Sequence, residues 1–367
     1  MLSRQSLIDD LESAIANGEI GRRAESLRRV TDLFVSGATH YTDEQIALFD
    51  DVMSRLASEI ETTARSTFGQ RLMTVPNAPP GIIRTLALDD AIEVAGPILS
   101  QSEQLDDATL VEGARTKGQD HLLAIAGRKT LAEAVTDVLV ERGNQQVAQS
   151  TAANPGARFS EFGYSTLVKR SENDAELALR VWARPEIPRQ HLLKLFGDAS
   201  ESVRAQLEGA DNRKADLIRD MVARAAEQVQ TQSRECSAEY ILAWAHVRSL
   251  HEAGKLDEQA LRDMANMGKF DETTIALSTM CKLPIGVIER AVAREWSEQI
   301  LVLAKSIGLS WDTTKAILLL QAGTKGSSTH EINQCFERFG KLQPQTAKKV
   351  IEFYRLRERA ASAARPN

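Results

Sequence analysis

The sequence predicts an all-α protein, and three observations support this fold class. Apolar residues recur at spacings of three and four, as at Ile46, Phe49, Val52 and Leu56, which is the period of an amphipathic helix. Alternating runs of β-branched and aromatic residues, which are typical of strands, are almost missing. Aromatic residues form only 5% of the chain. We therefore expect roughly fifteen to twenty short helices.

Three capping boxes predict where helices begin. Thr42 is followed three residues later by Gln45, Thr130 by Glu133, and Ser328 by Glu331. In a capping box the hydroxyl and the Gln or Glu side chain each accept a hydrogen bond from a backbone N–H at the helix start. The sequence therefore predicts helices that begin directly after Thr42, Thr130 and Ser328.

Internal repetition in the middle of the chain predicts an α-solenoid of HEAT-like helix pairs. The matches include Ala91 with Ala132 at an offset of 41, Val140 with Trp182 at an offset of 42, and Val147 with Leu177 at an offset of 30. One amphipathic helix pair cannot bury its apolar face alone, and the next pair in a stack completes the core. On the sequence alone, chance matches within any all-α chain stay the alternative.

Several phrases of the chain resemble known α-solenoids. Segments 146–155 (QVAQSTAANP) and 198–204 (DASESVR) are similar to HEAT-like and leucine-rich-variant repeats. A Leu-Pro helix start at Leu283 and a helix that ends in Gly308 and Leu309 extend the likeness. Most of the chain thereby resembles the alphaproteobacterial domain-of-unknown-function family 2336. This resemblance implies an α-helical repeat fold and an alphaproteobacterial origin, but no activity and no functional residue.

Breaks in the helical pattern predict three parts. Residues 1–74 form a helical N-terminal part, and residues 75–209 hold the HEAT-like repeats. Residues 210–367 form a C-terminal helical domain, which starts with a long helical stretch from about 216 to 235. One continuous superhelix and two packed domains both stay open as the arrangement of these parts.

Composition and charge exclude several functional classes. The chain has 45 basic and 51 acidic residues and a net charge of −6, so nucleic acid is an unlikely partner for the whole molecule. Three cysteines, Cys236, Cys281 and Cys335, are too few for a disulfide framework and fit a reducing compartment. No secretory signal and no segment long enough for a transmembrane helix is recognisable. The predicted location is cytoplasmic.

No motif in the sequence predicts catalysis, a cofactor or a metal site. Segment 323–328 (GTKGSS) lacks the spacing of a phosphate-binding loop. The closest histidine pair, His246 and His251, would project about 140° apart on a helix and cannot share one metal ion. Cys281 precedes Lys282, whose charge favours a reactive thiolate, but its apolar neighbours favour a buried, unreactive thiol. We expect a protein without enzymatic activity.

One stretch, residues 180–191 (RVWARPEIPRQH), carries the candidate interaction surface. It gathers Trp182, Arg184 and His191, and Trp and Arg dominate binding energies at interfaces. Because Trp182 aligns with Val140 in the repeats, we expect it in the core, with an exposed Trp182 as the alternative. Arg184 and His191 are expected to be exposed.

The last helix, predicted over residues 348–360, combines basic and apolar residues. Its charged residues are Lys348, Lys349, Arg355, Arg357 and Arg359 against Glu352 and Glu358. Such a helix can dock on the body of the protein, on a membrane surface or on a partner. A helix that caps the stack and exposes a basic edge is the simpler explanation.

The sequence therefore predicts a cytoplasmic α-solenoid that binds an unknown protein partner as a scaffold or regulator. The alternative is a HEAT-like nucleic-acid-binding protein or DNA-repair enzyme, for which Trp182, Arg184 and Glu186 supply suitable side chains. The net charge of −6 disfavours this alternative.

Overall fold

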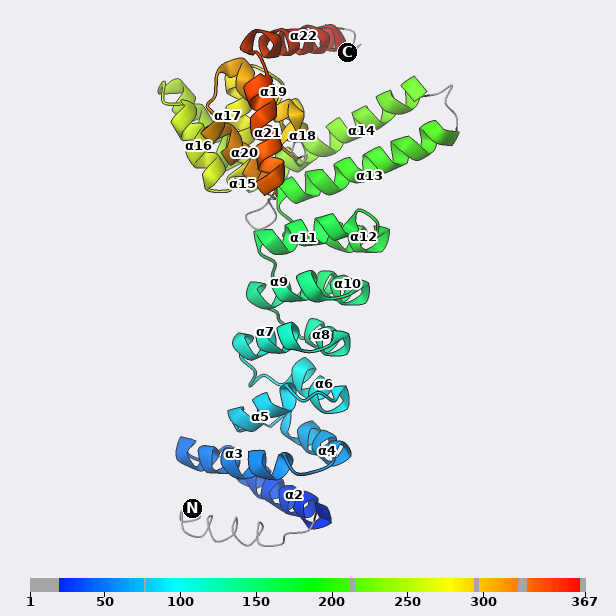
Figure 1. The fold of residues 1–367 in the computed structure, drawn as a ribbon, viewed down its shortest axis with the longest axis vertical. Coiled ribbons are helices and arrows are strands. Elements are labelled where there is room, and N and C mark those ends of the chain that lie inside the picture. Colours follow the sequence, from blue (N-terminus) through cyan, green and yellow to red (C-terminus); the bar gives the residue numbers. More distant parts are fainter. Residues whose placement is uncertain (1–19, 76, 211–214, 294–296, 323–328, 364–367) are drawn as a thin grey trace. The chain divides into compact units, whose positions relative to one another are not determined.

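The computed structural model describes residues 20–75, 77–210, 215–293, 297–322 and 329–363 (Figure 1). These residues form helices, with one isolated β-bridge between Leu131 and Ala157 and no strand. The all-α prediction is therefore confirmed. Segment 323–328, considered above as a phosphate-binding loop, lies outside the described residues, and so does Ser328 of the third predicted capping box.

The chain divides into two compact units, a first unit, Met1–Val181, and a second unit, Trp182–Asn367. The boundaries predicted at 74/75 and 209/210 stay predictions. Helices of the first unit are α2 (Ile20–Gly37), α3 (Asp43–Ala57), α4 (Thr62–Leu72), α5 (Pro80–Ala87), α6 (Ile92–Gln101), α7 (Asp107–Thr116), α8 (Gln119–Ala126), α9 (Glu133–Arg142), α10 (Gln145–Ala153), α11 (Glu161–Ser171) and α12 (Ala175–Trp182). Helices of the second unit are α13 (Arg189–Ala210), α14 (Ala215–Glu235), α15 (Ala238–Glu252), α16 (Glu258–Asn266), α17 (Phe270–Cys281), α18 (Ile285–Ala293), α19 (Glu298–Ile307), α20 (Trp311–Ala322), α21 (Thr329–Lys341) and α22 (Pro344–Ala363).

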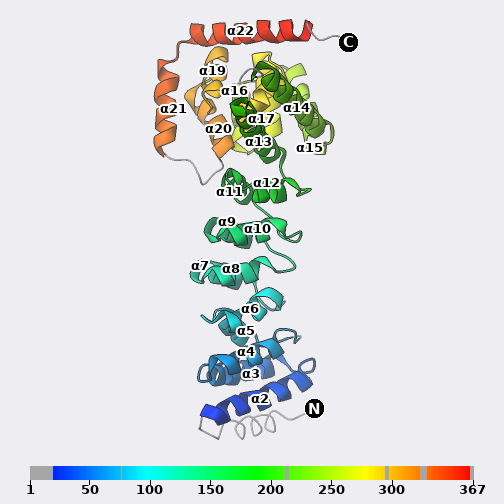
Figure 2. The ribbon, with the colours of Figure 1, turned by 90° about the vertical axis from the view of Figure 1, so that its right-hand side faces the viewer.

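The first unit is built of stacked helix pairs. The odd-numbered helices α3, α5, α7, α9 and α11 pack one on the next, and so do the even-numbered helices α2, α4, α6, α8 and α10 (Figures 1 and 2). The first helices of successive pairs begin at Pro80, Asp107, Glu133 and Glu161, which are 26 to 28 residues apart. Packing of each pair on its neighbours is the arrangement found in α-solenoids.

This period shows which of the sequence offsets is correct. The offset of 30 superposes Val147 of α10 on Leu177 of α12, which are both buried residues of second helices. The offset of 41 is wrong, because it superposes Ala91, which precedes α6, on Ala132, which precedes α9. α6 is the second helix of its pair, whereas α9 is the first helix of its pair. Because both helices have the same apolar period, a match of apolar residues does not show which helix of a pair it belongs to.

Side chains of the three pairs α7/α8, α9/α10 and α11/α12 cap the helices of the preceding pair. The last carbonyl groups of a helix lack an intrahelical partner, and guanidinium or amide donors at that end satisfy them. The bonds are Arg128 to Leu99 O (2.6 Å) and Ser102 O (2.8 Å), Arg142 to Ala114 O, Arg170 to Val140 O (2.6 Å) and Gly143 O (2.8 Å), and Asn154 to Ala126 O (2.9 Å) and Arg128 O (2.7 Å). Each donor follows its acceptor by 26 to 30 residues, which is about one repeat. We call these four donor residues the capping ladder.

The turn between α8 and α9 shows why one predicted capping box fails. The Leu131 N–H donates to Gly156 O at 3.0 Å as part of the β-bridge. This bridge holds the backbone beside Thr130, so the N-cap of α9 is Ala132, without a side-chain cap. The box that starts at Thr42 is confirmed, because both of its reciprocal hydrogen bonds are present.

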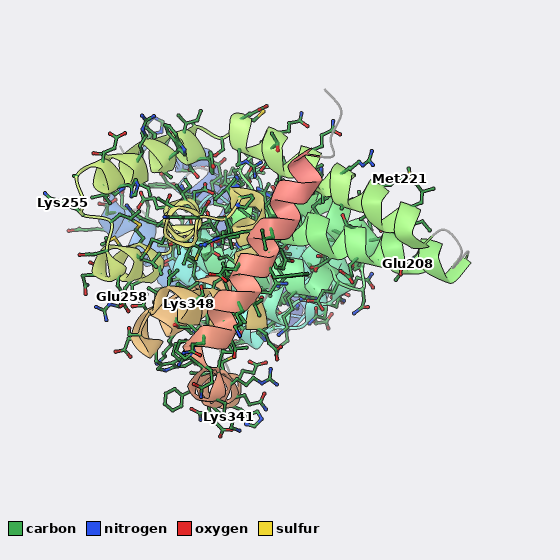
Figure 3. The ribbon with its side chains drawn as sticks, turned by 90° about the horizontal axis from the view of Figure 1, so that it is seen from above. Glu208, Met221, Lys255, Glu258, Lys341 and Lys348 are labelled. Carbon is green, nitrogen blue, oxygen red and sulfur yellow. The ribbon has the colours of Figure 1, made fainter. Side chains whose placement is uncertain are left out.

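The second unit is a bundle in which helices distant in sequence pack together. α16 packs on α20, α15 on α17, and α19 on α22, around a core that includes Leu261, Ile288 and Ile317. The longer helices α13 and α14 pack against each other as a hairpin, on which Figure 3 labels Glu208 and Met221. The contacts of this unit therefore do not follow the nearest-neighbour order of the first unit.

A buried ionic cluster ties together helices of the second unit. The carboxylate of Glu289 in α18 is fully buried and accepts hydrogen bonds from Arg189 of α13 and, at 2.7 Å, from Arg234 of α14. Arg189 also pairs with Asp271 of α17 and lies 4.7 Å from the centre of the Tyr240 ring. Burial raises the pKa of the Glu289 carboxyl, and the two guanidinium groups oppose that rise. Through these paired charges the cluster connects α13, α14, α17 and α18.

The capping ladder makes a testable contribution to stability. We expect Arg170→Ala to lower the free energy of unfolding by about 1–3 kcal/mol, because it leaves the carbonyl groups of Val140 and Gly143 buried without their donor. Chemical denaturation of the purified protein measures this loss.

A matched control separates capping from a general effect of losing an arginine. The Arg115 side chain in α7 is exposed and forms no hydrogen bond or ion pair among the described residues. Arg115→Ala should therefore change the free energy of unfolding by less than about 0.5 kcal/mol. Equal losses in both variants would contradict the capping role of Arg170.

Candidate functional site

A shallow groove in the first unit is the candidate binding site. Its volume is about 640 Å³, and its lining residues come mainly from α8, α10 and the turns that follow them. Three cations line it, Arg128 and Lys129 after α8 and Arg180 of α12, and none of the described side chains in the lining is acidic. Leu123 and Ala153 add an apolar part. The groove therefore joins positive charge to a small apolar surface.

The sequence of α10 explains why polar side chains face the groove. Asn144 caps the helix start, since its side chain accepts a hydrogen bond from the Val147 N–H at 3.0 Å. The buried side of the helix consists of Val147, Ala148, Thr151 and Ala152. The residues that line the groove are Gln146, Gln149, Ser150 and Ala153. At 100° per residue these four lie on the opposite side of α10, so the apolar stripe aims them outward.

The polar groups of α10 differ in how they are held. Gln146 and Ser150 form no side-chain hydrogen bond within the described part of the chain. The amide of Gln149 donates to both carboxylate oxygens of Asp174, at 3.0 and 3.1 Å. Asp174 also accepts from the Leu177 N–H at 3.0 Å. The Leu177 N–H and, to a smaller extent, the Gln149 amide lower the pKa of Asp174.

The three cations of the groove are not equivalent. Arg128 is partly buried and donates to the carbonyl groups at the end of α6. Arg180 pairs with Glu176 at 2.6 Å on the surface of α12, and such exposed pairs hold their partners weakly. Lys129 is exposed and forms no ion pair among the described residues. Lys129 is therefore the cation most open to a ligand, followed by Arg180.

The groove is equipped for recognition. Its described lining holds one hydroxyl, on Ser150, and no histidine or carboxylate next to it that could accept its proton. Nucleophilic catalysis by a hydroxyl needs such a base. Amide groups, by contrast, offer donors and acceptors together, and Lys or Arg attracts carboxylates and phosphates.

The predicted interaction residues lie in different surroundings from those expected. Trp182 is 40% exposed, with its ring centre 6.2 Å from that of Phe196, so the expectation of a core position is wrong. Arg184 and His191 are only 7% and 6% exposed, so the expectation that they are exposed is also wrong. Arg184 pairs with Glu186. A binding role for Trp182, Arg184 and His191 stays a prediction.

Helix register explains these errors. The offset of 42 superposes Val140 of α9 on Trp182 of α12, and thus a first helix on a second helix. The segment after α12 begins the second unit, and His191 lies in the first turn of α13 on the same side as the buried Leu195. His191 is buried because it lies on the same buried face of α13 as Leu195.

Sequence reasoning missed most of the groove, although a signal was present. Of the stretch predicted to bind, only Arg180 lines it. Gln146, Gln149 and Ser150 belong to the phrase that carried the solenoid resemblance, and they recur at spacings of three and four opposite the apolar residues. A polar stripe on a helix of such a stack indicates a surface open to a ligand.

Cys281 is unsuited to nucleophilic chemistry. It is fully buried, and this burial raises the pKa of its thiol to about 12. The thiol therefore stays protonated at neutral pH, and the thiolate is the nucleophilic form. The expectation that Cys281 is buried is confirmed, and its lack of reactivity stays a prediction.

The stacked pairs and the polar groove define the class of this protein as a helical-repeat protein. The domain-of-unknown-function family 2336, described as an uncharacterised protein conserved in bacteria, matches residues 94–352. The chain belongs to this family, as the resemblance predicted. No curated protein and no solved structure matches it. Among the described residues, no helix is long and apolar enough to cross a membrane.

The lowered pKa of Asp174 gives the stability of the protein a testable pH dependence. At neutral pH we expect Asp174→Ala to destabilise the protein by about 1 kcal/mol, because α12 loses its N-terminal cap. A carboxyl whose pKa is lower in the folded state stabilises that state above its ordinary value of 3.8 and loses this effect as the pH falls below it. The difference between the two proteins should therefore shrink in urea titrations at acid pH.

The variant Asp174→Asn is the control for this prediction. Asparagine is also a good N-cap, so this variant should keep most of the stability at neutral pH while it loses the dependence on acid. A loss that is the same at every pH for Asp174→Ala would contradict the role of the carboxylate.

Proposed function

We propose that this chain is a non-enzymatic interaction scaffold whose first unit binds an extended, acidic segment of a protein partner in the groove between α8, α10 and α12. The observation that supports this proposal is the groove's composition. It combines three cations with the Gln146 amide and the Ser150 hydroxyl, which form no side-chain hydrogen bond within the described chain, and has no acidic side chain among its described lining. Stacked repeats offer such extended surfaces for binding.

An extended peptide fits these groups better than a compact ligand does. The backbone of an extended segment presents N–H and C=O groups in alternation, and the Gln146 amide can both donate and accept. Acidic side chains of such a segment would meet Lys129 and Arg180, with Glu176 released from its exposed pair. Small apolar side chains would meet Leu123 and Ala153.

Nucleic acid is the second candidate ligand, since the same cations attract phosphates. Two features weigh against it. The net charge of the chain is −6, and Arg128 already donates to two carbonyl oxygens. Aromatic residues, on which single strands stack, are missing from the described lining of the groove.

Fluorescence anisotropy with two labelled probes tests this proposal. The probes are an extended peptide of alternating Glu and Ala and a single-stranded oligonucleotide of the same length. We expect the peptide to bind more tightly than the oligonucleotide at equal salt. Lys129→Glu combined with Arg180→Glu should weaken peptide binding by at least about tenfold, because it reverses two charges at the groove.

The control is Arg115→Glu combined with Lys169→Glu, which makes the same change of net charge at two exposed residues outside the groove lining. This control should keep the affinity within about twofold, since exposed charges at a distance are screened. Equal weakening in both double variants, or no binding of the peptide, would contradict the peptide groove. Tighter binding of the oligonucleotide would favour the nucleic-acid alternative.

A further inference from the structure

The last helix, α22, is attached to the second unit by one face. Ala347 is fully buried and Ile351 is 6% exposed, and the helix packs on α19. Arg355 donates a hydrogen bond to Cys281 O, at the end of α17. Figure 3 looks onto α22, with Lys348 labelled in its first turns. These contacts fix which side of the helix remains open.

The open side of α22 is strongly apolar. Its exposed apolar residues are Val350 (43%), Phe353 (67%), Tyr354 (38%) and Leu356 (65%). At 100° per residue these four side chains fall within one sector of about 160°, which borders Ala347 at Tyr354 and whose centre lies about 120° from the side that carries Ala347 and Ile351. Four large apolar side chains on one exposed face exceed the scattered exposure that is normal for a protein surface.

Positive charge accompanies this apolar face. Lys348 and Lys349 are exposed and form no ion pair among the described residues. The sequence of the helix continues with Arg357, Glu358 and Arg359. Among the described side chains of α22, Glu352 is the exposed acidic residue. Lys349 thus lies among the large apolar side chains and Lys348 at the flank of the open side, and neither lysine has an ion-pair partner within the described chain.

We infer that the open face of α22 binds the surface of an anionic lipid bilayer. Helices that lie in a bilayer interface have this composition, with an aromatic and aliphatic face that enters between the headgroups and lysines that meet anionic lipids. Long lysine side chains reach the headgroups while their stems stay beside apolar surface. The attachment through Ala347, Ile351 and Arg355 would hold the second unit at that surface. This inference does not depend on the peptide groove.

A second exposed apolar face, on α15, differs from that of α22 in its charge. The unpaired cations of α22 are the reason for expecting an anionic bilayer. On α15, Ile241, Leu242 and Trp244 are 56%, 71% and 45% exposed. The cation beside them, Arg248, is paired with Glu252 at 2.7 Å and lies 5.1 Å from the centre of the Trp244 ring. α15 is therefore as apolar as α22 on its open side but offers no unpaired cation there.

Co-flotation of the full chain with two kinds of vesicle tests the inference. One kind contains phosphatidylcholine alone, and the other contains equal parts of phosphatidylcholine and phosphatidylglycerol. We expect binding to the anionic vesicles, weak or no binding to the neutral ones, and a loss of binding as salt is raised. Lys348→Glu combined with Lys349→Glu should weaken binding by at least about thirtyfold, because each basic residue contributes to attraction at an anionic surface.

A second variant and a control separate the apolar contribution from general stickiness. Phe353→Ser combined with Leu356→Ser should weaken binding by about tenfold or more, since both side chains lose apolar surface that enters the interface. Ile241→Ser combined with Leu242→Ser on α15 should leave vesicle binding unchanged. Circular dichroism of each variant checks that the helices are retained.

Three results would overturn the inference. The first is equal binding to neutral and anionic vesicles, or none to either. The second is an equal loss in the α15 control and in the α22 variants. The third is self-association of the wild type, seen by sedimentation, that Phe353→Ser and Leu356→Ser abolish while no vesicle binding is found, which would assign the face to a second copy of the chain.

Discussion

The stack from α5 to α12 depends on hydrogen bonds that its later helix pairs donate to the pair before them. Its helices from α5 to α11 contain only 8 to 11 residues, and isolated helices below about 12–15 residues are marginal in water. Burial of their ends against a neighbour would leave carbonyl groups unsatisfied. The capping ladder supplies the missing donors from one repeat further along the chain. Each pair is therefore completed only when the next pair has docked.

The same ladder positions the candidate site. Arg128 and Asn154 both cap helix ends and line the groove, so the groove is fixed by the interaction that holds the stack together. The groups left for a ligand are those without such a structural task, Lys129, Gln146 and Ser150. Because the residues that hold the stack together differ from those that remain unbonded, the groove can be rigid and still offer hydrogen-bonding groups to a ligand.

The sequence predicted those features that depend on local pattern. The helical period gave the fold class, the box at Thr42 gave a helix start, and the family resemblance was confirmed. The sequence did not predict features that depend on partners one repeat away. The β-bridge of Leu131 shifts the start of α9 away from Thr130. The exposure of Trp182 was missed because the offset of 42 aligned it with the wrong helix of a pair. The groove was missed for the same reason, because its residues come from several helices whose stacking no short pattern specifies.

Hydrogen exchange of the variant Asn154→Ala tests the coupling between pairs most directly. The Asn154 amide donates to carbonyl groups at the end of α8, although the residue itself follows α10. The capping ladder predicts that this variant loses amide protection in α8 as well as in α10, since opening of one pair removes the donors of the other. A loss of protection that stays within α10 would show that the pairs are independent and would contradict the central role of the ladder.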